Sequence, residues 1–150
     1  MQTYLAILLS AILTAVVAIT SLIITVRTNR ANTKKAQTIT MLMQFHWDKD
    51  YIASRKIFQE CRDGGGIMSC VTNATLRSQV AQIINHYEIM SIGVNKGILS
   101  DDIFRAYFRS RLVKDFQQSR LYIEHVRDEV GNVKIYREFE ILAERWSKAP

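Results

Sequence analysis

Residues 4–26 read YLAILLSAILTAVVAITSLIITV and contain no charged side chain. An α-helix rises about 1.5 Å per residue, so this run would be roughly 35 Å long, enough to cross the hydrocarbon core of a bilayer. The run is too long for the apolar part of a cleaved secretory signal, and Met1–Thr3 carry no Lys or Arg. We therefore expect residues 1–26 to be an uncleaved transmembrane anchor. A signal peptide and a buried soluble helix are the alternatives.

Basic residues directly after this run predict its orientation. They are Arg27, Arg30, Lys34 and Lys35, and no acidic residue occurs among residues 27–35. Because Lys and Arg close to a span resist translocation, we expect the N-terminus to lie outside the cell and the C-terminal domain to lie in the cytoplasm. The four basic side chains also suit contact with the anionic headgroups of a lipid bilayer.

The net charge of +6 gives little support to nucleic-acid binding. Residues 36–150 contain 16 Lys and Arg against 14 Asp and Glu, so most of the surplus charge lies just after the span. A second basic cluster comprises Arg105, Arg109, Arg111 and Lys114, and the acidic residues near it in the sequence are Asp101, Asp102 and Asp115. We expect this cluster to be a solvated helix face that these acids partly neutralise. The alternative is a surface for an anion or an acidic partner.

A stripe of small and hydroxyl-bearing residues runs along the apolar segment. Its members are Ser10, Thr14, Ala18, Ser21 and Thr25. Steps of 4, 4, 3 and 4 place them within an arc of about 80° on a helix. Small residues allow helix backbones to approach closely in lipid, which predicts self-association of the span. The alternative is that the hydroxyls bond to carbonyls of their own helix.

The remaining sequence predicts an all-α fold. Residues 1–63 contain neither Gly nor Pro, so nothing forces a break after the span. We expect the span to continue into a basic juxtamembrane stalk helix at residues 27–47. Residues 48–150 should then form a small cytoplasmic bundle of about four to five helices, because apolar residues recur there at helical spacing and no alternating pattern typical of strands appears.

Glycines and capping residues predict where these helices begin and end. Glycines at 64–66, 97 and 131 are the expected C-terminal stops. Asp48 or Asp50 is the expected N-cap of the first helix of the bundle, and Ser100 is that of a later one. The helix that contains Leu76 and Val94 is apolar nearly all round in its second half, which is typical of a central helix.

The sequence contains no motif typical of a catalytic, cofactor or metal site. Cys61 and Cys70 lack the C-x-x-C spacing of zinc and redox sites, and in a reducing cytoplasm we expect free thiols. His46, His86 and His125 fall on three separate predicted helices, where a lone His is more often structural than a ligand. We therefore expect no catalytic residue, no cofactor and no metal.

Glu88 is the acidic residue with the most unusual position. It lies at the rim of the apolar arc of the most hydrophobic helix in the domain, where a carboxylate is costly unless it is paired. We expect Arg55 to be its partner in a structural ion pair, with Arg105 and Arg109 as the other candidates. The alternative is a polar pocket in which His86, Glu88 and an Arg serve a small membrane-bound enzyme or ligand sensor.

Two segments carry a resemblance to a known family. Residues 85–98 read NHYEIMSIGVNKGI, and residues 136–146 read YREFEILAERW. They resemble an uncharacterised bacterial and prophage-associated family, whose members have one N-terminal span, a polar stalk and a helical domain with an Asn-x-Tyr-Glu helix that ends in Gly. The resemblance covers most of residues 5–147 and implies a bacterial inner-membrane setting without indicating an activity. A prophage origin would fit interference with superinfecting phage at that membrane.

These observations lead to two hypotheses of function. The first is a membrane-anchored, non-enzymatic module whose cytoplasmic domain binds a protein partner or further copies of itself. It rests on the anchor, on the stripe in the span and on the absence of a catalytic constellation in the sequence. The second is the membrane-bound enzyme or sensor with a site around His86 and Glu88.

Overall fold

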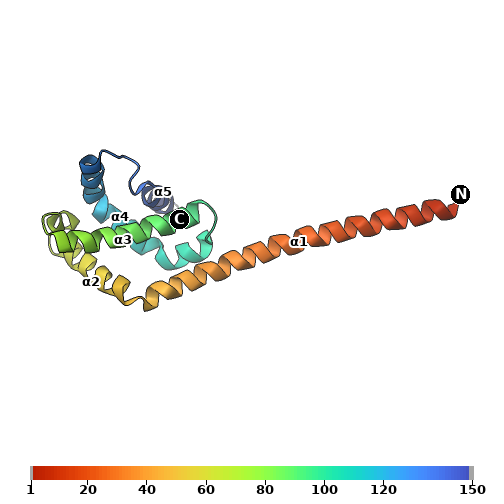
Figure 1. Ribbon diagram of the computed structural model, residues 1–150, viewed down its shortest axis with the longest axis horizontal. Coiled ribbons are helices and arrows are strands. Elements are labelled where there is room, and N and C mark those ends of the chain that lie inside the picture. Colours follow the sequence, from red (N-terminus) through yellow and green to blue (C-terminus); the bar gives the residue numbers. More distant parts are fainter. Residues whose placement is uncertain (1, 149–150) are drawn as a thin grey trace. The chain divides into compact units, whose positions relative to one another are not determined.

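The computed structural model describes residues 2–148, the side chains of Gln2, Leu5, Ala6 and Leu8 excepted, and this part of the chain contains helices and no strand. In order, the elements are α1 (Gln2–Trp47), α2 (Lys49–Asp63), the 3-10 helix η1 (Ile67–Cys70), α3 (Ala74–Asn95), α4 (Asp101–Val130) and α5 (Arg137–Lys148), as Figure 1 shows. The all-α prediction is therefore confirmed. The chain divides into two compact units, one up to Ala36 and one from Gln37 onward.

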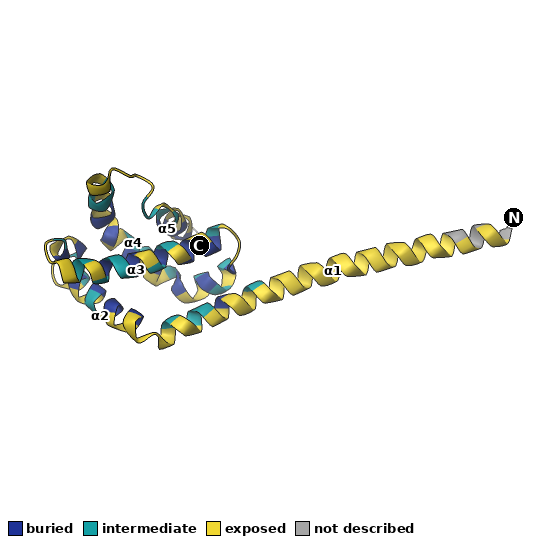
Figure 2. Cartoon of the chain, in the orientation of Figure 1, coloured by how far each residue is buried: buried dark blue, intermediate teal, exposed yellow. Residues whose placement is uncertain are grey.

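The first unit is the greater part of α1, and its segment from Tyr4 to Val26 exposes apolar side chains. The large hydrophobic side chains described between Tyr4 and Val26 are between 79% and 40% exposed (Figure 2). Among the described residues, one helix is long and apolar enough to cross a membrane, with its candidate segment at Leu9–Trp47. That finding rests on length and composition, and it agrees with an N-terminal apolar helix as predicted.

The second unit is a small bundle in which α3 takes the central place. α3 packs against α2 on one side and against α5 on another, and it also contacts η1 and α4. Its residues Val80, Ile83, Ile84 and Met90 are fully buried. The largest side chains around them are aromatic and less than 2% exposed: Phe58, Tyr87, Phe104, Phe108, Tyr122, Phe139 and Trp146.

The last three turns of α1 pack with this bundle. Thr38 is completely buried, and its Oγ1 accepts a 2.8 Å hydrogen bond from the backbone N–H of Ser100. Met41, Leu42 and Phe45 also pack against the core. We expected the stalk to reach residue 47, but the second compact unit begins at Gln37. The reason is that Met41, Leu42 and Phe45 pack against the core of that unit.

Local capping signals set most helix ends where the sequence placed them. Asp48 is the N-cap of α2, since its Oδ1 accepts from the backbone N–H groups of Asp50 at 2.9 Å and Tyr51 at 3.0 Å. Gly131 ends α4 in the left-handed region at φ 68°, which few other residues adopt. Ser100 stands at the N-cap position of α4, but its side chain makes no capping hydrogen bond.

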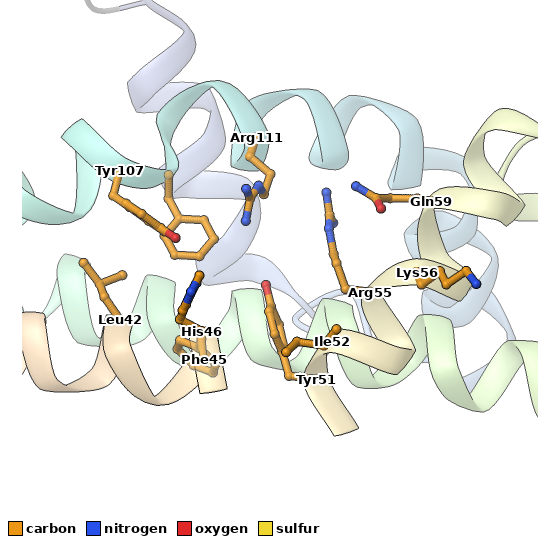
Figure 3. Close-up of a pocket in the computed structure, with 11 residues that line it drawn as sticks. Leu42, Phe45, His46, Tyr51, Ile52, Arg55, Lys56, Gln59, Tyr107 and Arg111 are labelled. Atoms are coloured by element: carbon orange, nitrogen blue, oxygen red, sulfur yellow. The ribbon is translucent and has the colours of Figure 1, made fainter. Parts of the chain in front are cut away.

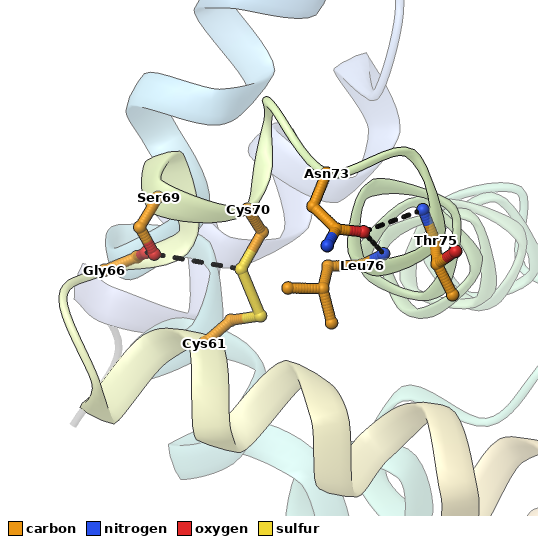
Figure 4. The surroundings of a disulfide bond; sticks show 7 residues. All are labelled: Cys61, Gly66, Ser69, Cys70, Asn73, Thr75 and Leu76. Carbon is orange, nitrogen blue, oxygen red and sulfur yellow. Dashed lines mark hydrogen bonds between the residues drawn. A yellow bond between two sulfur atoms is a disulfide. The ribbon is translucent and has the colours of Figure 1, made fainter.

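The two cysteines form a disulfide, so the expectation of free thiols is wrong. Cys61, near the end of α2, is bonded to Cys70 in η1, and their Cα atoms are 6.4 Å apart (Figure 4). The glycines at 64–66 turn the chain so that η1 packs against α2. This turn brings together two residues that are nine apart in the sequence.

Candidate functional site

A buried polar cluster around Asp115 joins three helices of the bundle. The Asp115 carboxylate on α4 is fully buried and accepts from Arg55 Nη1 of α2 at 2.5 Å and from Tyr87 Oη of α3 at 2.6 Å. Arg62 Nη1 donates to its other oxygen at 3.2 Å. Asp115 was expected on a solvated face and is instead in the core, which corrects that prediction. Its charge is compensated there by Arg55 and Arg62, as a buried carboxylate requires.

The electrostatics of this cluster favour a charged guanidinium and a neutral phenol. Burial opposes the charge of Arg55, but the neighbouring Tyr87 and Asp115 outweigh it and raise the pKa of the guanidinium. Burial and the charge of Asp115 raise the pKa of Tyr87 well above its usual value. Tyr87 therefore acts as a hydrogen-bond donor to Asp115 across the core.

Glu88 does not pair with Arg55, so the predicted ion pair is wrong. Its carboxylate accepts from the backbone N–H groups of Glu138 at 3.2 Å and Phe139 at 2.7 Å, at the start of α5. The first N–H groups of a helix have no partner within the helix, and a carboxylate beside them also faces the positive end of the helix dipole. Burial raises the pKa of Glu88, and these two hydrogen bonds oppose that rise.

His86 and Glu88 do not share a pocket. The His86 ring packs edge-on against Phe45 and Tyr51, with centroid distances of 5.5 Å and 5.3 Å, and its Nδ1 lies 2.7 Å from the carbonyl oxygen of Gln82. Glu88 faces α5 instead. The polar site around these two residues, which was the alternative to a structural Glu88, is therefore not formed, because the two side chains contact different neighbours.

The residues predicted to contact lipid, and those of the stripe, lie on α1. Arg27, Arg30 and Lys35 are exposed and Lys34 is half-buried, and the whole stripe is exposed. The hydroxyls of Ser10 and Thr14 donate to the carbonyl oxygens of Ile7 and Ser10 at 2.9 Å and 2.8 Å. These two hydroxyls thus follow the alternative of bonding within the helix. Lipid contact and self-association both remain predictions.

A cavity of about 390 Å³ opens between the end of α1, α2 and α4 (Figure 3). We call it the aromatic cation pocket, and its lining residues are Leu42, Phe45, His46, Tyr51, Ile52, Arg55, Lys56, Gln59, Tyr107, Phe108 and Arg111. Four of them are Phe or Tyr and three are Lys or Arg, while none is Asp or Glu. Among the residues that the structure describes, no group of three His, Cys, Asp or Glu could hold a metal ion.

Two polar atoms of the aromatic cation pocket are buried without a partner. Tyr51 is 5% exposed and Arg55 is 8% exposed, so both residues are buried. Tyr51 Oη and Arg55 Nε nevertheless make no hydrogen bond with any described residue. Burial raises the pKa of Tyr51, and the charge of Arg55, the charge of Arg111 and the approach of the Arg111 side chain to the hydroxyl oppose that rise. Buried polar groups are usually hydrogen-bonded, so unpartnered donors beside a cavity mark this pocket as the candidate functional site.

Sequence reasoning missed both the cluster and the pocket, although one signal for the cluster was present. Asp115 follows Phe104, Phe108 and Leu112 at helical steps of 4, 4 and 3, so it falls on the apolar stripe of α4. Arg55 shares a face with Tyr51 and Phe58 in the same way. Opposite charges on two apolar faces predict a buried pair. The pocket has no comparable signal, because three helices contribute to it.

The chain belongs to a family described as a domain of unknown function (DUF4760), which matches residues 8–146. This match confirms the resemblance to a family of unknown function that was drawn from residues 85–98 and 136–146. No curated protein and no solved structure matches the chain. The family description names no activity, substrate or partner.

Proposed function

We propose that the protein is a single-span, membrane-anchored and non-enzymatic binding module of the bacterial inner membrane. The observation that carries this proposal is the uncovered apolar surface of α1 between Tyr4 and Val26, where the described large side chains are at least 40% exposed. A helix that is apolar all round needs lipid or protein around it, and its backbone groups are satisfied internally, as a bilayer requires. The helical domain from Gln37 onward is then the part that binds a partner.

Membrane extraction tests the anchor. The full chain should stay with the membrane fraction in high salt and through an alkaline carbonate wash, because apolar burial rather than the basic residues supplies most of the attachment. A matched control is a chain in which Leu13, Val17 and Ile24 are replaced by Lys, which keeps the length and should leave the membrane fraction. Release of the unmodified chain by carbonate alone would contradict the anchor.

For the orientation, we place the helical domain in the cytoplasm. The support is the basic group Arg27, Arg30, Lys34 and Lys35 directly after the apolar run. The Cys61–Cys70 disulfide is the opposing observation, since disulfides are typical of oxidising compartments. Reporter fusions at the C-terminus decide between the two sides of the membrane. In the proposed orientation a green fluorescent protein fusion is fluorescent and an alkaline phosphatase fusion is inactive. An active alkaline phosphatase fusion together with a non-fluorescent green fluorescent protein fusion would show the opposite orientation.

The partner is proposed to be a protein or a second copy of the chain. Affinity purification of a C-terminally tagged copy from detergent-solubilised membranes tests this directly, with a tagged chain that lacks residues 37–148 as the control. The resemblance to prophage-associated proteins adds a cellular proposal, interference with superinfecting phage. Phage plating on cells with and without the protein tests that role, and equal plating across a phage panel would contradict it.

A further inference from the structure

The aromatic cation pocket carries an inference that does not depend on the membrane anchor. We propose that it binds a small organic phosphate, a molecule that carries both a phosphate monoester and a flat aromatic ring. The cavity brings together two buried, unpartnered donors, Tyr51 Oη and Arg55 Nε, with Arg111 and with aromatic walls. Nothing in the anchoring or in the proposed protein partner uses these groups.

The charge around the cavity is positive and only partly compensated. Asp115 binds Arg55 through Nη1 from the core side and leaves Nε unbonded. Arg111 has its guanidinium carbon 5.3 Å from the centre of the Phe108 ring, and no described carboxylate lies within salt-bridge distance of it. Lys56 reaches Glu60 only at 3.9 Å, and both side chains are largely exposed, so this pair neutralises little. A doubly charged anion suits this balance.

The donors around the cavity suit the acceptor oxygens of a phosphate group. A phosphate monoester presents three acceptor oxygens, and the planar fork of a guanidinium binds two of them at once. Figure 3 shows the Tyr51 hydroxyl and the Arg111 guanidinium directed toward the same space from opposite sides of the cavity. One phosphate group between them would complete the hydrogen bonds of Tyr51 Oη and would lie close to Arg55.

The walls indicate what the phosphate is attached to. Phe45, Tyr51, Tyr107 and Phe108 line a cavity of about 390 Å³, which is within the usual range for small-molecule sites. Tyr107 is 53% exposed, so its ring has the most free surface, and inorganic phosphate would leave it uncovered. A flat ring would stack on Tyr107, so we commit to a soluble ester such as a mononucleotide rather than to the headgroup of a lipid.

The test is calorimetric titration of the full chain in phosphatidylcholine nanodiscs with phenyl phosphate and with adenosine monophosphate. Both probes should bind, and Arg111→Gln and Tyr51→Phe should each weaken binding by about tenfold, the loss typical of one hydrogen bond to a charged group. Tyr51→Phe should leave the thermal stability unchanged or raise it, because it removes an unpartnered buried hydroxyl. Arg120→Gln is the matched control, since it removes the same charge from the opposite face of α4 and should not alter affinity.

Four results would overturn the proposal. The first is that neither probe binds the unmodified chain at millimolar concentration. The second is binding that survives unchanged in both Arg111→Gln and Tyr51→Phe. Inorganic phosphate binding as tightly as phenyl phosphate would refute the aromatic body. Loss of probe binding in nanodiscs that contain phosphatidic acid, with retention in phosphatidylcholine, would assign the site to a lipid headgroup instead.

Discussion

Replacing Asp115 by Ala should strongly destabilise the helical domain. The substitution removes a fully buried carboxylate that accepts hydrogen bonds from Arg55, Tyr87 and Arg62. It leaves the guanidinium of Arg55, which is 8% exposed, without its ion-pair partner inside the core. Removing one member of a buried pair typically costs about 3–5 kcal/mol. We expect a loss of that size in the free energy of unfolding.

The assay uses the buried Trp146 as its probe. The chain contains two Trp, and Trp47 is 72% exposed, so a Trp47→Phe background leaves Trp146 as the only indole. Urea unfolding of the full chain in detergent micelles, followed by the fluorescence of Trp146, then gives the free energy. Asp63→Ala is the matched control because Asp63 also bonds Arg62, at 2.8 Å, but its side chain is 66% exposed. It should cost less than about 1 kcal/mol.

The comparison between the two Asp variants tests whether burial sets the cost of losing a carboxylate. Equal losses for Asp115→Ala and Asp63→Ala would refute the idea that burial sets the cost. A second variant checks the mechanism, since Arg55→Met added to Asp115→Ala removes the stranded charge. The double variant should recover part of the lost stability, through a coupling of about 0.5–3 kcal/mol between the two positions. If the two substitutions lower the free energy of unfolding by the sum of their separate effects, the two positions are not coupled and the mechanism is wrong.

The remaining predictions concern Glu88, the disulfide and the stripe on α1. Glu88→Ala should cost about 1 kcal/mol in urea unfolding, the scale of a lost helix cap, rather than the cost of a broken buried pair. Because burial raises the pKa of Glu88, the unmodified chain should lose stability relative to Glu88→Gln as the pH rises from below 4.5 through the raised value. Reduction with dithiothreitol should lower the free energy of unfolding by about 2.6 kcal/mol for a closed loop of about nine residues, and a Cys61→Ala variant should not respond. Ala18→Leu should reduce crosslinked dimer in membranes while Leu22→Ala does not, and equal yields would contradict pairing through the stripe.

The order and ends of the helices could be predicted because their signals are local. Asp48 caps α2 through atoms two and three residues away, and Gly131 ends α4 through its own backbone conformation. The periodicity of α3 likewise depends only on the residues within it. These features depend on neighbouring residues and not on how the helices pack, so a single sequence is enough to predict them.

The partners of charged residues could not be predicted with the same success because they depend on packing between helices. Glu88 was expected to bind an Arg, and it instead accepts from two backbone N–H groups of α5. Every residue except Pro has a backbone N–H, so the sequence does not indicate which N–H group will bind a carboxylate. Arg111 is exposed on α4, and only the arrival of α1 and α2 beside it turns a solvated helix face into the wall of a cavity.

The disulfide and the basic residues after the apolar segment indicate different compartments, and the core positions of the two cysteines suit both redox states. Cys61 and Cys70 are 7% and 2% exposed and belong to the hydrophobic core. A free Cys behaves as a small apolar side chain, so the same core positions suit the reduced thiols. The bond contributes one term of a few kcal/mol beside the burial of the aromatic core. The reporter fusions report the compartment and the reduction experiment reports the contribution of the bond to stability, so the two experiments measure independent quantities.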